Sequence, residues 1–260
     1  MTRRDDGGLA IDFLGHATLL IEIDGVRILT DPLVRDHVGP LDRQVEPLPH
    51  TAFERVDVVL ISHLHQDHLD FASLRRLQPA PRLIVPAGAG GLVRAAGYAD
   101  VDELDAEGST RHGPVHIAAT PAIHSGRRLP FGPTAVALGF VVEGATRRVY
   151  FAGDTDLFDG MAAIGDRDID VALLPVWGWG PNLRGGHLDP VKAARSLTLL
   201  RPRMAVPIHW GTYWPRGMGM VRPDRLRLPA TEFEAAAREV APDVRVVVTA
   251  PGRPVRLPRD

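Results

Sequence analysis

The stretch "LISHLHQDHLD", residues 60–70, places three histidines and one aspartate within six consecutive positions. It continues the apolar run "VDVVLIS", residues 56–62, which is typical of a buried strand. On an extended chain, side chains two apart point the same way, so His63 and His65 face one side while the aspartate and third histidine begin the next turn. Three histidines directly after a buried strand favour a metal site over a run of solvated surface histidines.

Polar residues also follow three later apolar runs. They are His124 in "AATPAIHSG", Asp154 in "VYFAGDTD" and His209 in "MAVPIHWGT". A catalytic metal needs at least three protein ligands. Each residue has an ordinary structural explanation when taken alone, but together with the first cluster they complete two metal positions: His63, His65 and His124 for one, Asp67, His68 and His209 for the other, and Asp154 bridging them.

The composition indicates a globular protein with a sizeable core. The chain has 260 residues, of which 45% are hydrophobic. Its mean hydropathy is -0.03. It contains no apolar run near the length of a membrane span, and the start "MTRRDDGGLA" lacks the apolar segment of a signal peptide. We therefore expect no membrane span and a cytoplasmic location.

Charge and cysteine content narrow the classes of partner and ligand. Thirty basic residues stand against 32 acidic ones, and the arginines are scattered, so nothing favours a nucleic-acid partner. The absence of cysteine excludes disulfides and thiolate ligands. Any metal must therefore be held by histidine nitrogen and carboxylate oxygen.

Short apolar runs separated by Gly, Pro and Asp dominate the chain and predict many strands. They are residues 11–15, 18–23, 26–30, 56–62, 82–86, 115–120, 135–144, 147–153, 170–176, 204–209 and 244–250. Fewer stretches predict helices: 70–77, capped by Asp70; 88–97, ended by Gly97; 189–200, capped by Asp189; and 231–240, capped by Thr231. This alternation indicates an α/β (α+β) fold, a sandwich of mixed sheets with helices outside, in a single domain over residues 1–260.

Residues 36–51, "DHVGPLDRQVEPLPHT", interrupt the strand patterns without a pattern of their own. The segment is rich in proline. We expect it to form a long loop with a functional role.

The motif His-x-His-x-Asp-His formed by His63, His65, Asp67 and His68 resembles that of the metallo-β-lactamase superfamily without departure. The later His, "GDT" aspartate and final His also fit in order and context, so the resemblance spans roughly residues 9–214. It implies an αββα sandwich, with two mixed sheets packed face to face, helices on the outer faces and the metals at one edge.

Within this superfamily the chain looks like the branch that contains the N-acyl-phosphatidylethanolamine phospholipase D enzymes and the ascorbate-6-phosphate lactonases. The resemblance rests on "FLGHATLLIEIDGVRILTDPL" (13–33), "FAGDTDLFDGMAAIG" (151–165), and "GHLDPVKAA" (186–194) leading to "PIHWGTY" (207–213). These stretches favour the phospholipase side of the branch and imply a phosphodiester substrate. The segment after His124, "SGRRLPFGPTAVALGF", is shorter than the corresponding aromatic-rich stretch of these relatives.

Three further residues have two interpretations each. By resemblance, Asp31 in "LTDP" accepts a hydrogen bond that orients a metal-bound histidine, but an aspartate before Pro32 also forms turns. His16 in "GHAT" supports the site or fills the core beneath it. His187 in "GGHLDP" matches a substrate-facing histidine of the phospholipase-like proteins, and we expect it to contact the substrate or protonate the leaving group.

Aromatic residues are scarce, yet five of them flank the proposed site loops: Trp177, Trp179, Trp210, Tyr213 and Trp214. This clustering is consistent with a pocket wall for an apolar part of the substrate, or with ordinary loop packing. Arg127 and Arg128 follow His124 closely and could hold a phosphate, but the simpler explanation is that they are surface arginines.

The predicted ligand set indicates hydrolysis. Two divalent ions about 3.5–4 Å apart can share a water, lower its pKa and present a bridging hydroxide to phosphorus or to a carbonyl carbon. We expect two Zn²⁺ per chain, with Mn²⁺ or Fe²⁺ as alternatives, and catalytic roles for Asp67 and His187. The leading prediction is a phosphodiesterase acting on a small-molecule or lipid-like substrate. The alternative is a lactonase or other carboxylic ester hydrolase, and a di-iron oxidoreductase or a non-catalytic binding protein ranks below both.

Overall fold

The computed structural model of the protein describes residues 8–128, 132–178, 185–217 and 223–257. Runs of Val, Ile and Leu form most of the strands that the sequence predicts, because β-branched and aliphatic side chains pack well on a pleated sheet. The strands are β1 (Ala10–Gly15), β2 (Thr18–Ile23), β3 (Val26–Thr30), β4 (His37–Val38), β5 (Leu41–Arg43), β6 (Val58–Leu60), β7 (Arg82–Pro86), β8 (Val101–Leu104), β9 (Ser109–His112), β10 (Val115–Pro121), β11 (Leu138–Glu143), β12 (Arg148–Phe151), β13 (Val171–Pro175), β14 (Met204–Ile208), β15 (Tyr213–Pro215), β16 (Arg245–Val246) and β17 (Arg253–Pro254).

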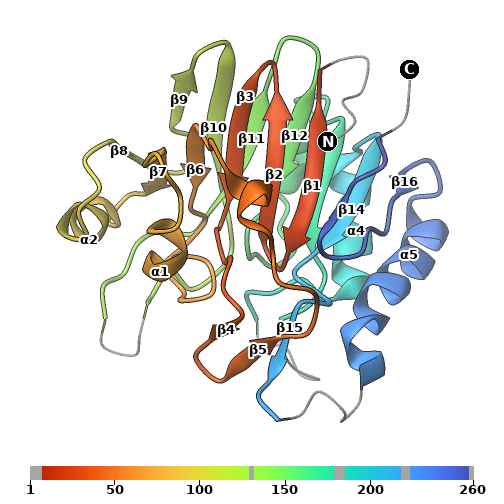
Figure 1. Ribbon diagram of the computed structural model, residues 1–260. Coiled ribbons are helices and arrows are strands. Elements are labelled where there is room, and N and C mark those ends of the chain that lie inside the picture. The colour runs from red at the N-terminus through yellow and green to blue at the C-terminus, as the bar shows by residue number, and fades with distance from the viewer. Residues whose placement is uncertain (1–7, 129–131, 179–184, 218–222, 258–260) are drawn as a thin grey trace.

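Two large mixed sheets form the centre of the fold (Figure 1). Within the described ranges, the N-terminal sheet has seven strands in the order β17-β1-β2-β3-β6-β7-β8, and the C-terminal sheet has seven in the order β16-β14-β13-β12-β11-β10-β9. In these orders, the N-terminal sheet has three antiparallel pairs followed by three parallel pairs, and the C-terminal sheet has three parallel pairs followed by three antiparallel pairs. The predicted sandwich of two mixed sheets is therefore confirmed.

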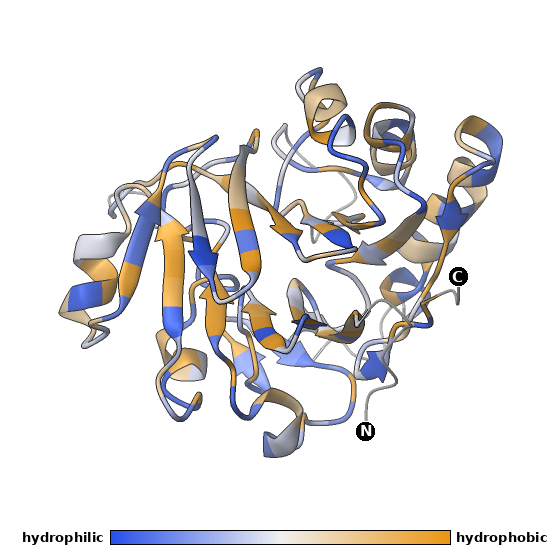
Figure 2. Cartoon of the chain, turned by 90° about the horizontal axis from the view of Figure 1, so that it is seen from above, coloured by the Kyte–Doolittle hydropathy of each residue, from blue (hydrophilic) through white to orange (hydrophobic). Residues whose placement is uncertain are grey.

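The main core lies between the two sheets. Inward-facing residues of the N-terminal sheet, such as Ile21 and Ile28, belong to one cluster with Phe140 and Leu173 of the C-terminal sheet, and all four are completely buried. Burying one such side chain contributes roughly 1.5–3 kcal/mol. In Figure 2 the strands carry most of the hydrophobic residues, whereas the helices show both hydrophobic and hydrophilic ones.

Helices cover the outer faces of both sheets. The helices are α1 (Phe71–Leu74), α2 (Gly90–Ala95), α3 (Met161–Gly165), α4 (Pro190–Leu200) and α5 (Leu228–Val240), with 3-10 turns η1 (His50–Phe53) and η2 (Pro223–Leu226). Buried residues of α1 and α2 pack in a second cluster with Val59 and Leu83, which face outward from the N-terminal sheet. Those of α4 and α5 join the main core from the C-terminal sheet's side. Among the described residues, no helix is long and apolar enough to cross a membrane.

Helix ends follow the predictions at two caps and differ at a third. The Asp70 side chain accepts a hydrogen bond from Ser73 N at the start of α1, and the Asp189 side chain accepts one from Lys192 N at the start of α4. The prediction that Thr231 caps the last helix is wrong, because α5 begins three residues earlier at Leu228. The Thr231 hydroxyl instead donates to Leu228 O within the first turn, at 2.9 Å.

Two segments have a different structure from the predicted one. Residues 36–51 are not an irregular loop, since β4 and β5 form a hairpin there and β5 pairs with β15 in a small three-stranded sheet. The predicted strand 244–250 reduces to β16, the two-residue edge strand Arg245–Val246. An edge position gives an apolar run only one neighbouring strand to pair with.

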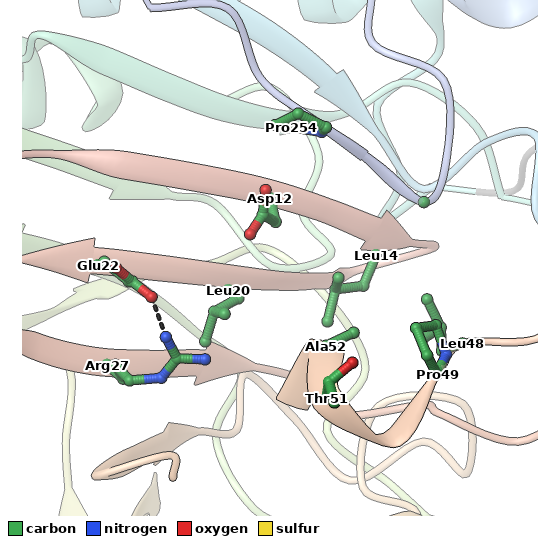
Figure 3. A pocket seen from close by; sticks show the side chains of 11 residues that line it. Asp12, Leu14, Leu20, Glu22, Arg27, Leu48, Pro49, Thr51, Ala52 and Pro254 are labelled. Atoms are coloured by element: carbon green, nitrogen blue, oxygen red, sulfur yellow. Dashed lines mark hydrogen bonds and ion pairs between the residues drawn. The ribbon is translucent and has the colours of Figure 1, made fainter. Parts of the chain in front are cut away.

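A pocket of about 880 Å³ lies on the outer face of the N-terminal sheet (Figure 3). Its floor includes Asp12 and Leu20 of β1 and β2, its wall includes Pro49, and the ion pair between Glu22 and Arg27 lies inside it. The pocket shares no residue with the polar clusters described next.

Candidate metal centre

The polar residues singled out in the sequence lie where strands end. Asp31 follows β3 and His63 follows β6, and these two strands run parallel in the N-terminal sheet. Asp154 and His209 follow β12 and β14, which run parallel to β13 between them. Since the carboxyl ends of parallel strands meet at one edge of a sheet, each sheet brings its polar residues to an edge, as in other α/β proteins. His124 lies three residues beyond β10.

Three histidines form the first cluster. The Nε2 atom of His63 lies 2.9 Å from Nδ1 of His65, which lies 3.1 Å from Nε2 of His124. One ring nitrogen of each histidine falls within 4.8 Å of the other two. These are the three residues that the sequence grouped as one metal position.

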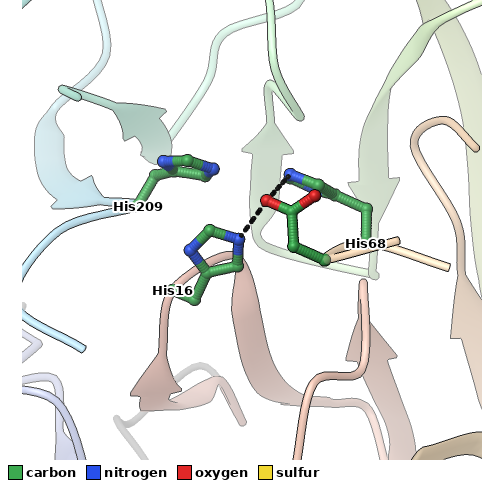
Figure 4. Close-up of side chains that lie close together, drawn as sticks. His16, His68 and His209 are labelled. Atoms are coloured by element: carbon green, nitrogen blue, oxygen red, sulfur yellow. Dashed lines mark hydrogen bonds and ion pairs between the residues drawn. The ribbon is translucent and has the colours of Figure 1, made fainter. Parts of the chain in front are cut away.

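The second cluster contains four residues, which are His16, Asp67, His68 and His209 (Figure 4). The sequence grouped three of them and gave His16 only a supporting role. In the structure the Nε2 atom of His16 lies 3.0 Å from Oδ2 of Asp67, and its ring centroid lies 4.0 Å from that of His209. The backbone joins them too, because His209 N donates to His16 O at 2.8 Å.

Asp154 lies between the histidines of the second cluster. Its Oδ2 atom is 3.4 Å from Nε2 of His68, and its Oδ1 atom is 3.5 Å from Nε2 of His209. The preceding residue, Gly153, has a φ of +59°, and a Cβ placed there would lie 2.6 Å from Cβ of Ser62. Only glycine therefore lets the end of β12 approach the loop after β6 closely enough to bring Asp154 to the histidines.

Asp31 contacts one of the candidate ligands. Nδ1 of His68 donates to Oδ2 of Asp31 at 2.7 Å, and both side chains are completely buried. Asp31 also accepts hydrogen bonds from the backbone N–H and the hydroxyl of Ser62. Of its two interpretations, the geometry supports the one in which Asp31 orients a histidine, since such a bond fixes the tautomer and leaves Nε2 available.

His187 lies beside both clusters. Its Nε2 atom is 3.7 Å from Oδ2 of Asp154, and its ring meets that of His124 edge to face at 4.7 Å. Its Nδ1 atom is buried and has no hydrogen-bond partner among the described residues. The side chain thus faces the candidate ligands, as the sequence indicated.

Burial keeps most of the histidines neutral. It lowers the pKa of His65 to about 4 and that of His209 to about 3, and it holds the pKa of His63 well below the usual value. Burial also lowers the pKa of His124. Neutral imidazole is the form that binds a metal, so these four rings are ready to do so near neutral pH.

The carboxylates have the complementary charge. Burial opposes ionisation of Asp67 and Asp154, but neighbouring histidines hold the pKa of each well below its usual value. For His68, burial opposes protonation, yet Asp154, Asp67 and Asp31 raise its pKa well above the usual value. Negative charge thus concentrates around the position that His68 Nε2 faces, which favours a bound cation.

Two buried atoms indicate that the clusters fit metal ions. Among the described residues, Nε2 of His68 and Oδ1 of Asp154 are buried and make no hydrogen bond. Buried polar atoms without a partner are rare in folded proteins because each is costly. The donors are imidazole nitrogens and carboxylate oxygens, which suit Zn²⁺, Mn²⁺ and Fe²⁺.

Two residues near the clusters were not given these roles from the sequence. Arg128 Nη1 donates to the carbonyls of Leu64 and Leu69, at 2.9 Å each, and so ties together the loop that carries four candidate ligands. Asp156, in the quoted "GDTD", accepts a hydrogen bond from Gly186 N at 3.1 Å. The only sequence signal for Asp156 was its place directly after "GDT", two residues beyond Asp154.

The two arginines of the pair have different surroundings. Nη1 of Arg128 donates to two backbone carbonyls and the guanidinium lies over the Phe71 ring at 5.2 Å, so Arg128 has a structural role. Arg127 is exposed and pairs with Thr134 in a β-bridge.

Tyr213 and Trp210, two of the residues predicted for an aromatic pocket wall, are buried, and Trp210 lines a pocket of about 760 Å³ that contains none of the candidate ligands. Tyr213 is completely buried, and its hydroxyl donates to Arg35 O at 2.6 Å. Trp210 belongs to the main core and its Nε1 donates to Pro207 O at 2.8 Å. Both aromatic rings pack inward to satisfy a polar atom at a backbone carbonyl. Trp177 stacks on Trp214 with ring centroids 5.5 Å apart, and Trp179 lies outside the described residues.

Comparison with known protein families and sequences gives consistent matches. The model of the beta-lactamase superfamily domain matches residues 26–210. A metal-dependent hydrolase of Opitutus terrae is 32% identical over 258 residues, which are 96% of this chain and all of that protein. An N-acyl-phosphatidylethanolamine-hydrolyzing phospholipase D of Caenorhabditis elegans is 32% identical, over 80% of this chain and 65% of that enzyme. An uncharacterized protein of Mycobacterium tuberculosis is 34% identical over 81% of this chain, and the match spans 61% of its length.

Solved structures with the same fold include a metallo hydrolase from Ignicoccus hospitalis. It has a TM-score of 0.72 and 25% identity, and the match covers 97% of this chain and 99% of that one. A diiron β-hydroxylase from Streptomyces venezuelae also has a TM-score of 0.72, at 20% identity, over 98% of this chain and 55% of that one. The second similarity concerns the fold alone.

Proposed function

This chain belongs to the metallo-β-lactamase superfamily, and from that premise we propose that it is a metal-dependent, binuclear hydrolase that cleaves a phosphodiester. The observation that carries the binuclear part is the pair of donor clusters with Asp154 between them, in which His68 Nε2 and Asp154 Oδ1 are buried without a hydrogen bond. The proposal takes the sandwich, residues 1–260, as one domain.

The chain's own residues divide between two metal positions in this proposal. His63, His65 and His124 would hold the first ion, and Asp67, His68 and His209 would hold the second, with Asp154 available to both. Asp31 fixes the His68 ring through the 2.7 Å contact. His16 holds the Asp67 carboxylate in place, because its Nε2–H donates to Oδ2 at 3.0 Å. Both ions are Zn²⁺, and Mn²⁺ or Fe²⁺ can replace them in this donor set.

Divalent ions bound at these positions would supply Lewis acidity and make a water nucleophilic near neutral pH. Two side chains beside these positions, Asp154 and His187, contribute to the reaction. Asp154 is buried and ionised, and its carboxylate lies 3.7 Å from His187 Nε2. We assign to His187 the proton that the leaving-group oxygen takes up as its bond to phosphorus breaks, since Nε2 is the ring atom that faces the centre.

The substrate class is inferred from one relative. The phospholipase D of Caenorhabditis elegans acts on a phosphodiester by its name, and its match extends over 80% of this chain. We take the substrate to be a lipid-like or small-molecule phosphodiester. We place the activity in the cytoplasm.

Initial rates on two small substrates test the proposal. A simple aryl phosphodiester and a simple lactone are compared with Zn²⁺ or Mn²⁺ present, and the Asp67→Asn variant gives the background. A metal-dependent rate on the diester alone supports the phosphodiesterase. A rate on the lactone alone replaces it with a lactonase or other ester hydrolase, the alternative with the same donor clusters.

Metal analysis of the purified protein tests the binuclear assignment separately. Two equivalents per chain are expected in the wild type, and His65→Ala or Asp154→Ala should lower the metal content and the activity together. Full activity in either variant, or a single equivalent after saturating Zn²⁺, would count against two positions.

A further inference from the structure

Three segments that carry candidate site residues meet around Asp156. Asp156 N donates to Ile123 O at 3.0 Å, next to His124. On the other side, Oδ2 of Asp156 accepts from Gly186 N at 3.1 Å, next to His187. Asp156 itself lies two residues beyond Asp154. One residue therefore connects the backbone around His124, Asp154 and His187.

Gly186 links Asp156 to the His124 ring. Its N–H is bound by Asp156, and its carbonyl accepts from Nδ1 of His124 at 2.6 Å. That bond fixes the His124 tautomer so that Nε2 faces His65. Gly186 has a φ of +101°, a conformation that a residue with a side chain rarely adopts, so the peptide reaches both partners only with glycine there.

Lys192 anchors Asp156 to the scaffold. Its Nζ atom lies 2.7 Å from Oδ1 of Asp156 and comes from the first turn of α4. That helix begins at the Asp189 cap and buries Ala193 and Leu197 in the main core. The ion pair is partly buried, at 18% exposure for Asp156 and 36% for Lys192. A rigid helix thus sets the position of the carboxylate.

We propose that Asp156, held by Lys192, is a positioning residue that places His187 for proton transfer and locks the His124 ring through Gly186. The inference rests on the proposed function for the roles of His187 and His124. It predicts two separable effects of losing the carboxylate, one on turnover and one on metal retention. Groups that support metal ligands in this way typically change affinity or activity about 10–100-fold.

The first test compares Asp156→Asn and Asp156→Ala with a matched control. The control, Asp166→Asn, also removes an ion-paired aspartate. Asp166 pairs with Arg201 at the same 2.7 Å distance, but both partners there are exposed. We expect kcat on the aryl phosphodiester to fall about 10–100-fold in the Asp156 variants, with KM changed less than about threefold. Asp166→Asn should match the wild type. An unchanged kcat in folded Asp156 variants would overturn the turnover part.

The second test measures metal release without any substrate. Protein loaded with Zn²⁺ alone is mixed with excess EDTA, and the loss of each equivalent is followed. One equivalent should leave about 10-fold faster from Asp156→Ala than from the wild type, because the His124 ring is no longer fixed. Lys192→Met should give a smaller change in the same direction. Equal release rates in all variants would overturn the link through Gly186.

A double-mutant cycle separates positioning from general damage. If Asp156 acts on turnover through His187, then adding Asp156→Asn to His187→Gln should lower kcat no further, although it should still speed metal release. Two independent, multiplying losses in kcat would refute the link to His187.

The cycle also distinguishes failure of the proposed function from failure of this inference. If His187→Gln alone keeps full activity, the proton-transfer role is wrong. Asp156 is then judged by metal release alone, where faster release supports the lock on His124 and unchanged release rejects it.

Discussion

Asp31 and His68 form a completely buried pair in which Nδ1 of the histidine donates to Oδ2 of the aspartate at 2.7 Å. The two residues lie 37 positions apart: Asp31 directly follows β3, and His68 lies in the segment between β6 and α1. The pair directs Nε2 of His68 toward Asp154, at 3.4 Å. The orientation of a candidate ligand thus depends on a residue from a different segment of the chain.

Replacing Asp31 should therefore weaken metal binding. Asp31→Asn removes the charge that holds the His68 tautomer, and we expect a loss of about 10–100-fold in affinity for the second ion, with activity falling in parallel. Competition with a chromophoric chelator measures the affinity. Asp57→Asn is the control, because Asp57 also accepts a backbone N–H, from Arg27 at 2.8 Å, without contacting the clusters. Equal zinc affinity in both variants would contradict the role of Asp31.

Arg128 should contribute to stability, and Arg127 should not. Arg128→Met leaves the carbonyls of Leu64 and Leu69 without that donor, which we expect to cost about 1–3 kcal/mol in the free energy of unfolding. Arg127→Met changes an exposed neighbour and should stay within about 0.5 kcal/mol. Urea unfolding of metal-loaded protein measures both. A raised KM for the diester in Arg127→Met would support the phosphate-binding interpretation of that residue.

The metal-free protein should lose stability as the pH falls below about 6. His65 and His209 have folded-state pKa values of about 4 and about 3, below the ordinary 6.5, so the unfolded chain takes up their protons first. The stability that they contribute is present above pH 6.5 and is lost as the pH falls toward those values. His68, whose pKa is raised, acts in the opposite sense, but its contribution is fully present below 6.5.

Urea midpoints of the metal-free protein at about pH 6 and about pH 4.5 check this dependence. His209→Asn removes one of the depressed groups and should flatten the change, and Asn tolerates the φ of 63° found at this position. A midpoint that rises on acidification, or the same slope in His209→Asn, would show that burial of these rings does not control the stability.

Removal of the metal should abolish activity and lower the melting temperature. Without cations, the buried His68 Nε2 and Asp154 Oδ1 have no hydrogen-bond partner among the described residues, and the carboxylates lose a compensating charge. A ligand at 100 times its Kd stabilises the folded state by about 2.7 kcal/mol. Melting curves before and after dialysis against EDTA, followed by added Zn²⁺, measure the effect. Unchanged activity after complete removal would exclude a metal-dependent reaction.

The sequence predicted those parts of the site that follow from local spacing. Two histidines on an extended segment must point the same way, so the grouping of His63 with His65 needed no knowledge of the fold. Later residues at strand ends could be added because the ends of parallel strands share an edge. The contact between His16 and Asp67 could not be predicted in this way, because the two residues lie 51 positions apart in the chain.

Residues missed or misassigned from the sequence depend on contacts between distant segments. Asp156 and Arg128 bind backbone groups. Every residue has a backbone, so the sequence does not show which residue such a side chain will contact. Tyr213 and Trp210 lie near His209 along the chain, but spacing does not reveal that their rings turn inward. The sequence around Thr231 has the pattern of a helix cap, but the helix begins about one turn earlier, at Leu228.

The positions of the candidate ligands along the chain also set an order for biosynthesis. All three histidines of the first cluster have been made once residue 124 has been added, and Asp154 follows 30 residues later in the chain. The second cluster lacks His209 until β14 has been made. During translation, every donor of the first cluster is therefore present before the second cluster is complete. In the proposed binuclear centre, the second position would stay incomplete until His209 has been added.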